Sequence, residues 1–274
     1  MSKVKLKDGT TIYCLDKVSA KHTVMEIFEE EIYSHFKIEE GLTIFDVGAN
    51  IGLFTLFVSQ KTRNSSIYAF EPVPDIFKVL KKNISNFSSN NTYHPFNIGL
   101  GSKKENQEIT FYPNISTIST FLPNNPKTEF SNILIKWDEY TKDISSLSKY
   151  VPVFLRSPIL KLVYPYFYST KKRWVEINTL SNLIRNDNIS EIDILKIDAE
   201  NFELQILKGI DPPHWKLIKS IMLEIHGNVE NGKLIMSEVV KLLESNNFNI
   251  KIRKDESMNS IGLEMIYARN RNYD

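Results

Sequence analysis

The chain has 274 residues, of which 42% are hydrophobic, enough to bury a sizeable core as one α/β domain or two small ones. The formal net charge of +1 excludes a strong overall attraction to nucleic acid, so no nucleic-acid partner is expected. Cys14 is the single cysteine, which excludes an intrachain disulfide and favours a reducing, cytoplasmic location. No apolar run approaches the ~20 residues of a spanning helix, and residues 1–14 lack the apolar region of a signal peptide.

The first forty residues predict a small N-terminal unit. Residues 3–15 alternate in polarity on either side of Asp8-Gly9, a pair typical of a turn, which indicates a hairpin. Residues 23–36 place apolar side chains at helical spacing, and Gly41 ends this pattern. We therefore expect a hairpin followed by a helix within residues 1–40.

The stretch from residue 43 to residue 60 organises the rest of the chain. Residues 43–47 form a short apolar run around Asp46, which is typical of a buried strand. Gly48 and Gly52 follow, and the next residues show apolar side chains at helical spacing. A strand that turns into a helix through glycines is the ligand-binding corner of an open α/β sheet. The start of that helix offers free N–H groups to a ligand.

The glycine spacing distinguishes between cofactors. A dinucleotide fingerprint requires G-x-G-x-x-G and a P-loop ends in Gly-Lys-Ser/Thr, whereas residues 46–52 read D-x-G-x-x-x-G. This pattern resembles motif I of class I methyltransferases, which use S-adenosylmethionine. That cofactor carries an ammonium, a carboxylate and a sulfonium in place of a pyrophosphate. A NAD-dependent oxidoreductase stays open as the alternative, and the spacing disfavours it.

A second β-rich run, residues 65–72, carries Glu71 near its end. This acid lies about 20 residues beyond the glycine turn, the spacing at which a carboxylate binds ribose hydroxyls. A carboxylate there can accept both hydroxyl protons of an adenosine ribose. The alternative is a solvated acid that caps the following helix, whose entrance holds Pro72 and Pro74.

Several segments together resemble the FkbM family of methyltransferases. They are DVGANIG (46–52), AFEPVP (69–74), NIGLGSKKE (97–105), LKIDAENFELQILKG (195–209) and LEIH (223–226). The resemblance runs from about Gly41 to Tyr267 and implies a Rossmann-like fold, S-adenosylmethionine as cofactor and a sugar or glycan hydroxyl as acceptor. The cofactor-binding residues that it implies are Asp46, Gly48, Asn50, Gly52, Glu71, Pro72 and Asn97.

The resemblance also bears on the flanking segments. In related methyltransferases the segment before the first strand covers the methionine end of the cofactor. Residues 1–40 are expected to do the same through Glu31 or Tyr33, with a solvated helix face as the alternative. The methyltransferase domain is then residues 41–274. The family often has an acid where Ser102 stands and usually has glycine where Asn201 stands, so a different turn is expected at the latter position.

Residues 121–173 interrupt the alternation of strands and helices. They contain five prolines and many aromatic residues and end in Lys171, Lys172 and Arg173. Because a structureless loop of this length is unusual in a compact domain, we expect an inserted lid or subdomain. Its rings could stack on a sugar, and the three terminal cations could hold an acidic group of the acceptor. A homo-oligomer contact and a peripheral membrane helix, over residues 151–168, are the alternatives.

The remaining chain completes an α/β pattern. We expect the run 108–114 to pair with the run 92–100, β structure to resume at residues 174–180, and buried strands over 191–198 and 220–226. The order predicts a mostly parallel seven-stranded sheet with helices on both faces and an antiparallel C-terminal strand. Ligands should lie beyond the carboxyl ends of its strands. The polar residues expected at that edge are Asp46, Gly48, Glu71, Asn97, Asp198, Glu224 and His226.

Transfer of a methyl group to a hydroxyl benefits from a general base, and Asp198 and His226 are the candidates. Asp198 could instead bind the cofactor's ammonium or cap its helix, and His226 could be a surface residue. Glu200 is expected to contact the acceptor. Asp198, Glu200 and Glu224 could alternatively form an oxygen-rich Mg²⁺ site, although their spacing is not diagnostic.

The sequence therefore predicts an S-adenosylmethionine-dependent O-methyltransferase that acts on a sugar or glycan. Two other functions stay open. One is the NAD-dependent oxidoreductase. The other is a catalytically inactive cofactor-binding partner in glycan assembly, although the presence of Asp46, Gly48 and Glu71 argues that cofactor binding is retained.

Overall fold

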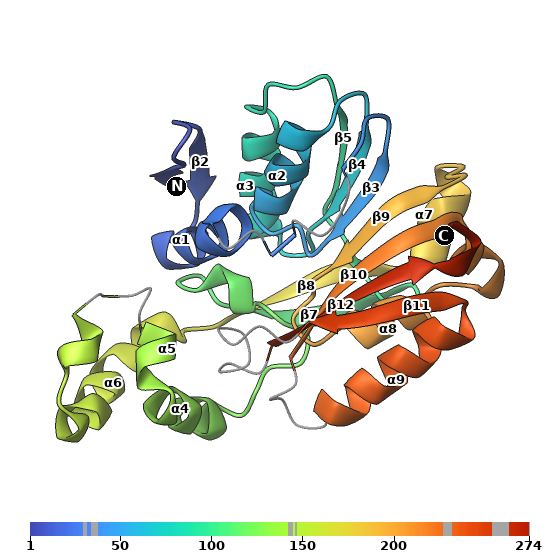
Figure 1. Ribbon diagram of the computed structural model, residues 1–274. Coiled ribbons are helices and arrows are strands. Elements are labelled where there is room, and N and C mark those ends of the chain that lie inside the picture. The colour runs from blue at the N-terminus through green and yellow to red at the C-terminus, as the bar shows by residue number, and fades with distance from the viewer. Residues whose placement is uncertain are drawn as a thin grey trace.

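The computed structural model describes residues 1–29, 32–33, 38–141, 145, 147–226, 232–253 and 263–273, and the side chains of Glu139, His226 and Leu263 lie outside that description. A seven-stranded sheet forms the centre of the described part (Figure 1). In spatial order its strands are β11 (Phe248–Arg253), β12 (Leu263–Asn270), β10 (Ile218–His226), β9 (Ile192–Ile197), β3 (Thr43–Val47), β4 (Ser66–Phe70) and β5 (Thr92–Phe96).

The strand directions confirm the predicted Rossmann-like class I methyltransferase fold. Five strands, from β10 through β9, β3 and β4 to β5, pair in parallel. Strand β12 is antiparallel to both of its neighbours, β10 and β11. The carboxyl ends of β3, β4, β9 and β10 therefore meet at one edge of the sheet, which is where parallel α/β sheets bind ligands.

Helices cover both faces because consecutive strand residues point to opposite sides. Ile44 belongs to a core cluster with α2 (Leu53–Lys61), α3 (Pro74–Ile84) and the N-terminal segment. Its neighbour Phe45 belongs to a second cluster. The helices of that second cluster are α7 (Leu180–Asn186), α8 (Glu203–Lys208) and α9 (Gly232–Ser245). A short 3-10 helix, Pro212–Leu217, leads into β10, and another, Arg271–Tyr273, follows β12.

A second, three-stranded sheet corrects the expected strand pairing. β7 (Glu105–Phe111) pairs antiparallel with β8 (Lys171–Asn178), and β6 (Gly99–Leu100) lies parallel to β8. The prediction that 108–114 pairs with 92–100 is therefore wrong. The chain leaves the main sheet after β5, where the side chain of Asn97 donates to the carbonyls of Glu71 and Pro72 at 2.9 and 3.0 Å. β8 then offers β7 a longer partner strand than the two-residue β6.

The insertion folds as a small helical unit beside the second sheet (Figure 1). Its elements are α4 (Pro126–Ile135), α5 (Trp137–Thr141), a 3-10 helix at Ser148–Tyr150 and α6 (Val153–Phe167). Ile133, Trp137 and Leu160 form its own buried cluster. Lys171, Lys172 and Arg173, expected to close the insertion, instead begin β8.

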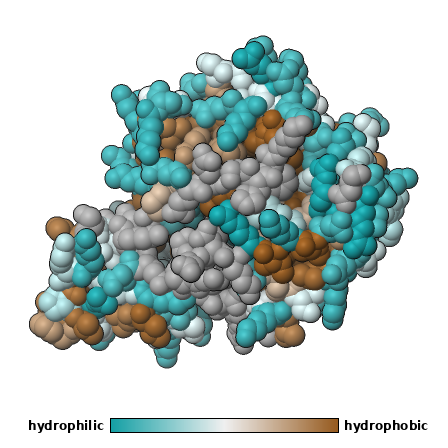
Figure 2. All heavy atoms as spheres, in the orientation of Figure 1, coloured by the Kyte–Doolittle hydropathy of each residue, from teal (hydrophilic) through white to brown (hydrophobic). Residues whose placement is uncertain are grey.

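The outer surface of α6 is apolar. Val153, Phe154 and Leu162 are 78%, 77% and 81% exposed, and brown spheres mark this lobe in Figure 2. Leu160, on the same helix, is buried in the cluster with Ile133 and Trp137. Within the described residues, no helix has the length and apolarity required to cross a membrane.

The N-terminal residues form a hairpin and a helix. β1 (Ser2–Lys5) pairs antiparallel with β2 (Thr11–Cys14), and α1 (Lys17–Val24) continues into a π-helical turn, Met25–Glu29. The helix begins at Lys17, earlier than the apolar pattern indicated, because Asp16 caps it by accepting a hydrogen bond from the Ser19 N–H at 2.7 Å. The other carboxyl oxygen of Asp16 accepts from the N–H and hydroxyl of Ser116, which ties α1 to the segment after β7.

Candidate active site

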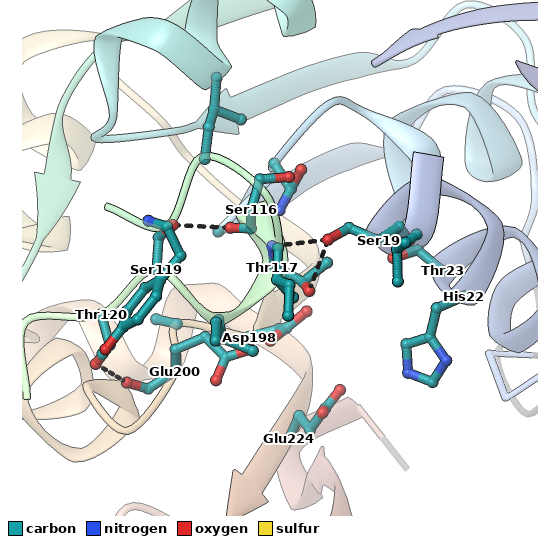
Figure 3. A pocket seen from close by; sticks show the side chains of 18 of the residues that line it. Ser19, His22, Thr23, Ser116, Thr117, Ser119, Thr120, Asp198, Glu200 and Glu224 are labelled. Carbon is teal, nitrogen blue, oxygen red and sulfur yellow. Dashed lines mark hydrogen bonds between the residues drawn. The ribbon is translucent and has the colours of Figure 1, made fainter. Parts of the chain in front are cut away.

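A cavity of about 740 Å³ lies at the carboxyl edge of the main sheet. Its lining combines the ends of β3, β4, β9 and β10 with α1, the segment 112–121 and the insertion helices. Figure 3 shows Ser116, Thr117 and Ser119 on one side, with Ser19 and His22 of α1 facing them. The volume falls within the ~300–1,000 Å³ typical of small-molecule sites. The cavity therefore has room for a cofactor and part of an acceptor.

The turn after β3 has a left-handed backbone, and its N–H groups donate hydrogen bonds within the protein, for example from Gly48 and Ala49 to the Phe70 carbonyl. Gly48, Asn50 and Gly52 have φ of 74°, 48° and 90°. A Cβ atom on Gly48 would lie 1.7 Å from the carbonyl oxygen of Asp198. Only glycine allows the loop after β3 to approach the end of β9 this closely. Gly48 and Asn50 line the cavity, whereas Gly52 lies behind it as the N-cap of α2.

Glu71 lies next to this turn in the cavity lining and is buried, with 4% of its surface exposed. One carboxyl oxygen accepts a hydrogen bond from the Asn50 N–H at 3.1 Å, and the other accepts from the Val73 N–H at 2.8 Å. Burial raises the pKa of Glu71 to about 7, against the lowering effect of these two donors. Each oxygen keeps a second lone pair with which a ligand hydroxyl can hydrogen bond.

Lys196 is a buried cation that the sequence reasoning did not assign. Its Nζ lies 3.2 Å from Oδ1 of Asp46 and 3.3 Å from Oδ2 of Asp198, and it donates to the Gly48 carbonyl at 3.0 Å. Burial alone would lower the pKa of Lys196, but Asp198 and Asp46 raise it, so the amine stays charged. The available signal was a lysine within the apolar strand sequence IDILKI, residues 192–197.

Asp46 lies beneath the cavity and outside its lining. Its carboxyl group is fully buried, and Oδ2 accepts a hydrogen bond from the Thr55 hydroxyl at 2.7 Å. With Lys196 on the other oxygen, Asp46 holds the buried ammonium in place. The residue thus supports the glycine turn from below, and the cavity wall itself is formed by Gly48 and Asn50.

Asp198, Glu200 and Glu224 bring three carboxyl groups to the cavity from β9 and β10 (Figure 3). Glu200 has a left-handed backbone, φ 50°, and its carbonyl accepts a hydrogen bond from the Thr120 hydroxyl at 2.6 Å. Burial, followed by the charge of Asp198, raises the pKa of Glu200 well above its ordinary value. Asn201, where the family usually has glycine, is also left-handed, φ 76°, a conformation that asparagine adopts more readily than most residues.

The three cations at the start of β8 lie outside the cavity lining. Lys172 contacts Glu108 at 3.1 Å and donates to the Thr110 hydroxyl at 2.9 Å, while Arg173 pairs with Asp75 at 2.8 Å. Their cross-strand and helix partners explain this placement, because pairing with β7 directs them along the second sheet. Lys171 is exposed on the same strand.

Other predicted residues are distributed as follows. Pro72 lines the cavity, whereas Asn97 is an exposed tether of the loop after β4. Tyr33 lines the cavity and packs against Phe54 at a centroid distance of 4.9 Å. His226 is the last residue of β10, with its side chain outside the described part, and Glu31 also falls outside the described residues.

The described residues do not support the suggested Mg²⁺ site. No group of three or more His, Cys, Asp or Glu side chains among them has an arrangement that could hold a metal ion, and this includes Asp198, Glu200 and Glu224. The charge next to Asp198 is instead provided by the ammonium of Lys196.

We expect Lys196→Met to lower the free energy of unfolding by about 3–5 kcal/mol, because it leaves the buried Asp46 carboxylate without its counter-charge. Urea denaturation measures this loss. The double variant Lys196→Met/Asp46→Asn should recover part of it, since the uncompensated charge is removed. Lys208→Met, which breaks the exposed pair with Glu238, is the matched control and should change stability by less than about 1 kcal/mol. Equal effects of the two single variants would contradict this account.

Comparison with known proteins gives a consistent picture. A family model described as the methyltransferase FkbM domain matches residues 46–250. The methyltransferase sdnD of Sordaria araneosa is 28% identical over 251 residues, covering 89% of this chain and 87% of its own. The 31-O-demethyl-FK506 methyltransferase FkbM of Streptomyces tacrolimicus is 26% identical, covering 97% and 96%. The hexuronic acid methyltransferase AglP of Haloferax volcanii is 25% identical, covering 79% and 67%. Since the family match spans most of the chain, the protein belongs to the FkbM family of methyltransferases.

Proposed function

We propose that the protein transfers the methyl group of S-adenosylmethionine to a hydroxyl group of a sugar or glycan. The observation that carries this proposal is the pairing of Glu71 with the glycine turn at one end of a cavity that continues to Asp198. The ribose hydroxyls would bind the free lone pairs of Glu71, and the backbone of Gly48 and Asn50 would border the cofactor. Ile98 and Gly99, which line the cavity, would border the adenine in place of Asn97.

The charges around the cavity support this cofactor over a dinucleotide. Among the described lining residues, the carboxyl groups belong to Glu26, Glu71, Glu129, Asp198, Glu200 and Glu224. Lys196 is the one lysine in that part of the lining, which holds no arginine, and His22 contacts Glu26 at 3.1 Å. Such a cavity attracts a sulfonium and an ammonium, and it repels the two negative charges of a pyrophosphate. The NAD-dependent alternative is disfavoured for this reason as well as by the glycine spacing.

The proposed reaction is an in-line displacement. The acceptor oxygen bonds to the methyl carbon, the carbon–sulfur bond breaks, and its electron pair neutralises the sulfonium to give S-adenosylhomocysteine. The hydroxyl proton passes to a carboxylate. Asp198 is the proposed base, and its contact with Lys196 orients the carboxyl group. Alignment of the three reacting atoms supplies most of the acceleration, which makes this orientation important.

Glu200 is the second candidate for the base. The carboxyl group of Asp198 is already engaged by the ammonium of Lys196, which lies 3.3 Å from its Oδ2. Glu200 has a raised pKa, which suits proton transfer near neutral pH. We propose that Glu200 contacts the acceptor hydroxyls. Substitution of Asp198 and of Glu200 distinguishes the general base from the acceptor contact.

The insertion is the proposed acceptor lid. Trp137, Tyr140 and Tyr164 line the cavity from the helical unit and could stack on a sugar ring. The sheet edge contributes mainly the cofactor-facing residues. Two relatives provide support for a sugar or other hydroxyl acceptor, since one is named a hexuronic acid methyltransferase and another a 31-O-demethyl-FK506 methyltransferase.

We expect Glu71→Gln to weaken the binding of S-adenosylhomocysteine by about 2–4 kcal/mol, because an amide cannot accept both ribose hydroxyls. Isothermal titration calorimetry measures the affinity, and a thermal melt confirms that the variant is folded. A titration with NAD in place of S-adenosylhomocysteine is the control for the class of ligand. Unchanged affinity in the variant would remove the ribose assignment.

Because the pKa of Glu71 is raised, both the stability of the protein and its affinity for the cofactor should depend on pH. Because the folded-state value of about 7 is above the ordinary value of 4.5, the contribution of this group to stability is present below about pH 4.5 and is lost as the pH rises to about 7. The affinity for the cofactor should change in the opposite direction and increase with pH, since the ionised carboxylate accepts both ribose hydroxyls. The affinity of the wild type should rise between about pH 6 and pH 8, and that of Glu71→Gln should stay level over the same range. Parallel pH profiles would contradict this expectation.

Asp198→Asn should reduce turnover by about 10²–10⁴-fold while leaving cofactor affinity nearly unchanged, because it keeps the shape and removes the proton acceptor. Release of S-adenosylhomocysteine over a panel of sugars measures turnover. Glu200→Gln is the matched variant, and a larger loss there would assign the base to Glu200. A joint fall of turnover and cofactor affinity in Asp198→Asn would place Asp198 in the cofactor site. Cofactor binding without any turnover would favour the inactive-partner alternative.

A further inference from the structure

The insertion places one carboxyl group among tyrosine rings. Glu129, from α4, lines the cavity together with Tyr112, Tyr164 and Tyr168. The rings of Tyr164 and Tyr168 are stacked, with centroids 4.4 Å apart, and Tyr112 meets Tyr168 edge-on at 6.3 Å. α4 and α6 pack against each other, so Glu129, Tyr164 and Tyr168 belong to the helical unit (Figure 1), and Tyr112 joins them from the segment after β7. We call these four residues the Glu129 pocket.

The Glu129 carboxyl group has neutral partners. Asn124 donates to Oε2 at 3.2 Å, and the Tyr168 hydroxyl forms a second hydrogen bond. Within the described part of the chain, no lysine, arginine or histidine forms an ion pair with it. Burial raises the pKa of Glu129, and Glu129 contributes to raising the pKa of all three tyrosines. Among the described residues, the charged form of this carboxyl group therefore lacks a cation that would stabilise it.

The three tyrosine rings around Glu129 also favour the binding of a cation. The faces of tyrosine rings attract an ammonium placed within about 6 Å of the ring centre, most strongly where water is excluded. A carboxylate next to such rings adds charge–charge attraction to the same ligand. A neutral sugar could stack on the rings, but it would leave the negative charge of Glu129 uncompensated. A carboxylate or phosphate on the acceptor would be repelled.

The cofactor cannot fill this role if it binds as proposed. Its ribose would be held at Glu71, directly after β4, and its sulfonium would face Asp198, directly after β9. Three of the four residues of the Glu129 pocket belong to the insertion, which is the proposed acceptor side of the same cavity. The expected acidic-group contacts, Lys171, Lys172 and Arg173, lie outside the lining and have their own partners or face solvent.

We propose that the Glu129 pocket binds a protonated amine, so that the acceptor is an amino sugar or another amine-bearing glycan and Glu129 determines this specificity. This inference rests on the proposed function. It adds a substrate class that differs from the hexuronic acid named for the relative AglP, whose substrate bears a carboxylate.

The test compares D-glucose with two derivatives that each change one group: D-glucosamine, with an amine at C2, and D-glucuronate, with a carboxylate at C6. Each is titrated into the full chain saturated with S-adenosylhomocysteine, and binding is followed by ligand-observed NMR. Glucosamine should bind about tenfold more tightly than glucose, as expected for one partly desolvated cation contact, and glucuronate should bind most weakly. Equal affinities, a preference for glucuronate, or no binding of glucosamine would overturn the inference.

Variants assign the preference to the pocket. Glu129→Gln keeps the shape and should lower the affinity for glucosamine to that for glucose, while the affinity for glucose is unchanged. Tyr164→Leu keeps the carboxyl group of Glu129 and should weaken the binding of both glucosamine and glucose. Asp138→Asn, an exposed carboxylate on α5 outside the described lining, is the matched control and should keep the wild-type preference. A preference for glucosamine that survives in Glu129→Gln would overturn the inference.

Calorimetry with S-adenosylhomocysteine separates this inference from the proposed function. If each variant binds the cofactor product normally but the amine preference is absent, only the Glu129 assignment fails. If the wild type does not bind the cofactor product, the proposed function fails and the inference fails with it.

Discussion

The buried ammonium of Lys196 is the constraint on which the site depends. It connects Asp46 on β3, the carbonyl of Gly48 and Asp198 at the end of β9, all within 3.3 Å. Two carboxylates this close would repel each other in an apolar sheet, and one buried cation makes both of them tolerable. The same contacts determine where the glycine turn lies relative to the carboxyl group proposed as the base. Stability of the sheet and geometry of the site therefore rest on one side chain.

The close approach of the two loops has a further consequence. Because Gly48 meets the backbone of Asp198 directly, no side chain separates the proposed cofactor wall from the proposed acceptor wall. Methyl transfer tolerates little error in the line of oxygen, carbon and sulfur, so a rigid joint between these walls is useful. Asp16 fixes the position of α1, which lines the cavity, since one of its carboxyl oxygens caps this helix and the other accepts a hydrogen bond from Ser116. α1 and the edge of the sheet are thus held in place by separate polar contacts.

The distribution of charge connects cofactor and acceptor. The described lining is dominated by carboxyl groups, and several belong to segments far apart in sequence, such as Glu26, Glu129 and Glu224. Burial raises the pKa of Glu71, Glu129 and Glu200, which means that burial opposes the ionisation of these groups. A positively charged ligand would restore the balance. This physical requirement favours a sulfonium cofactor at one end and, by the same argument, an amine at the other.

Sequence alone was sufficient for the main sheet and the glycine turn, because they depend on local periodicity and glycine spacing. It also predicted that Glu71 lies at the same sheet edge, and Glu71 lines the cavity there, while its role in binding ribose stays a prediction. Lys196 was missed as a site residue because its partners, Asp46 and Gly48, are about 150 residues away in the chain. The pairing of β7 with β8 and the placement of Lys171–Arg173 also required the tertiary structure, since strand pairing across an insertion has no local signal. The Glu129 pocket also required the tertiary structure, since its residues come from α4, from α6 and its C-cap, and from the segment after β7. Residues that are neighbours in sequence follow local preferences, whereas distant residues meet only where packing of the whole chain brings them together.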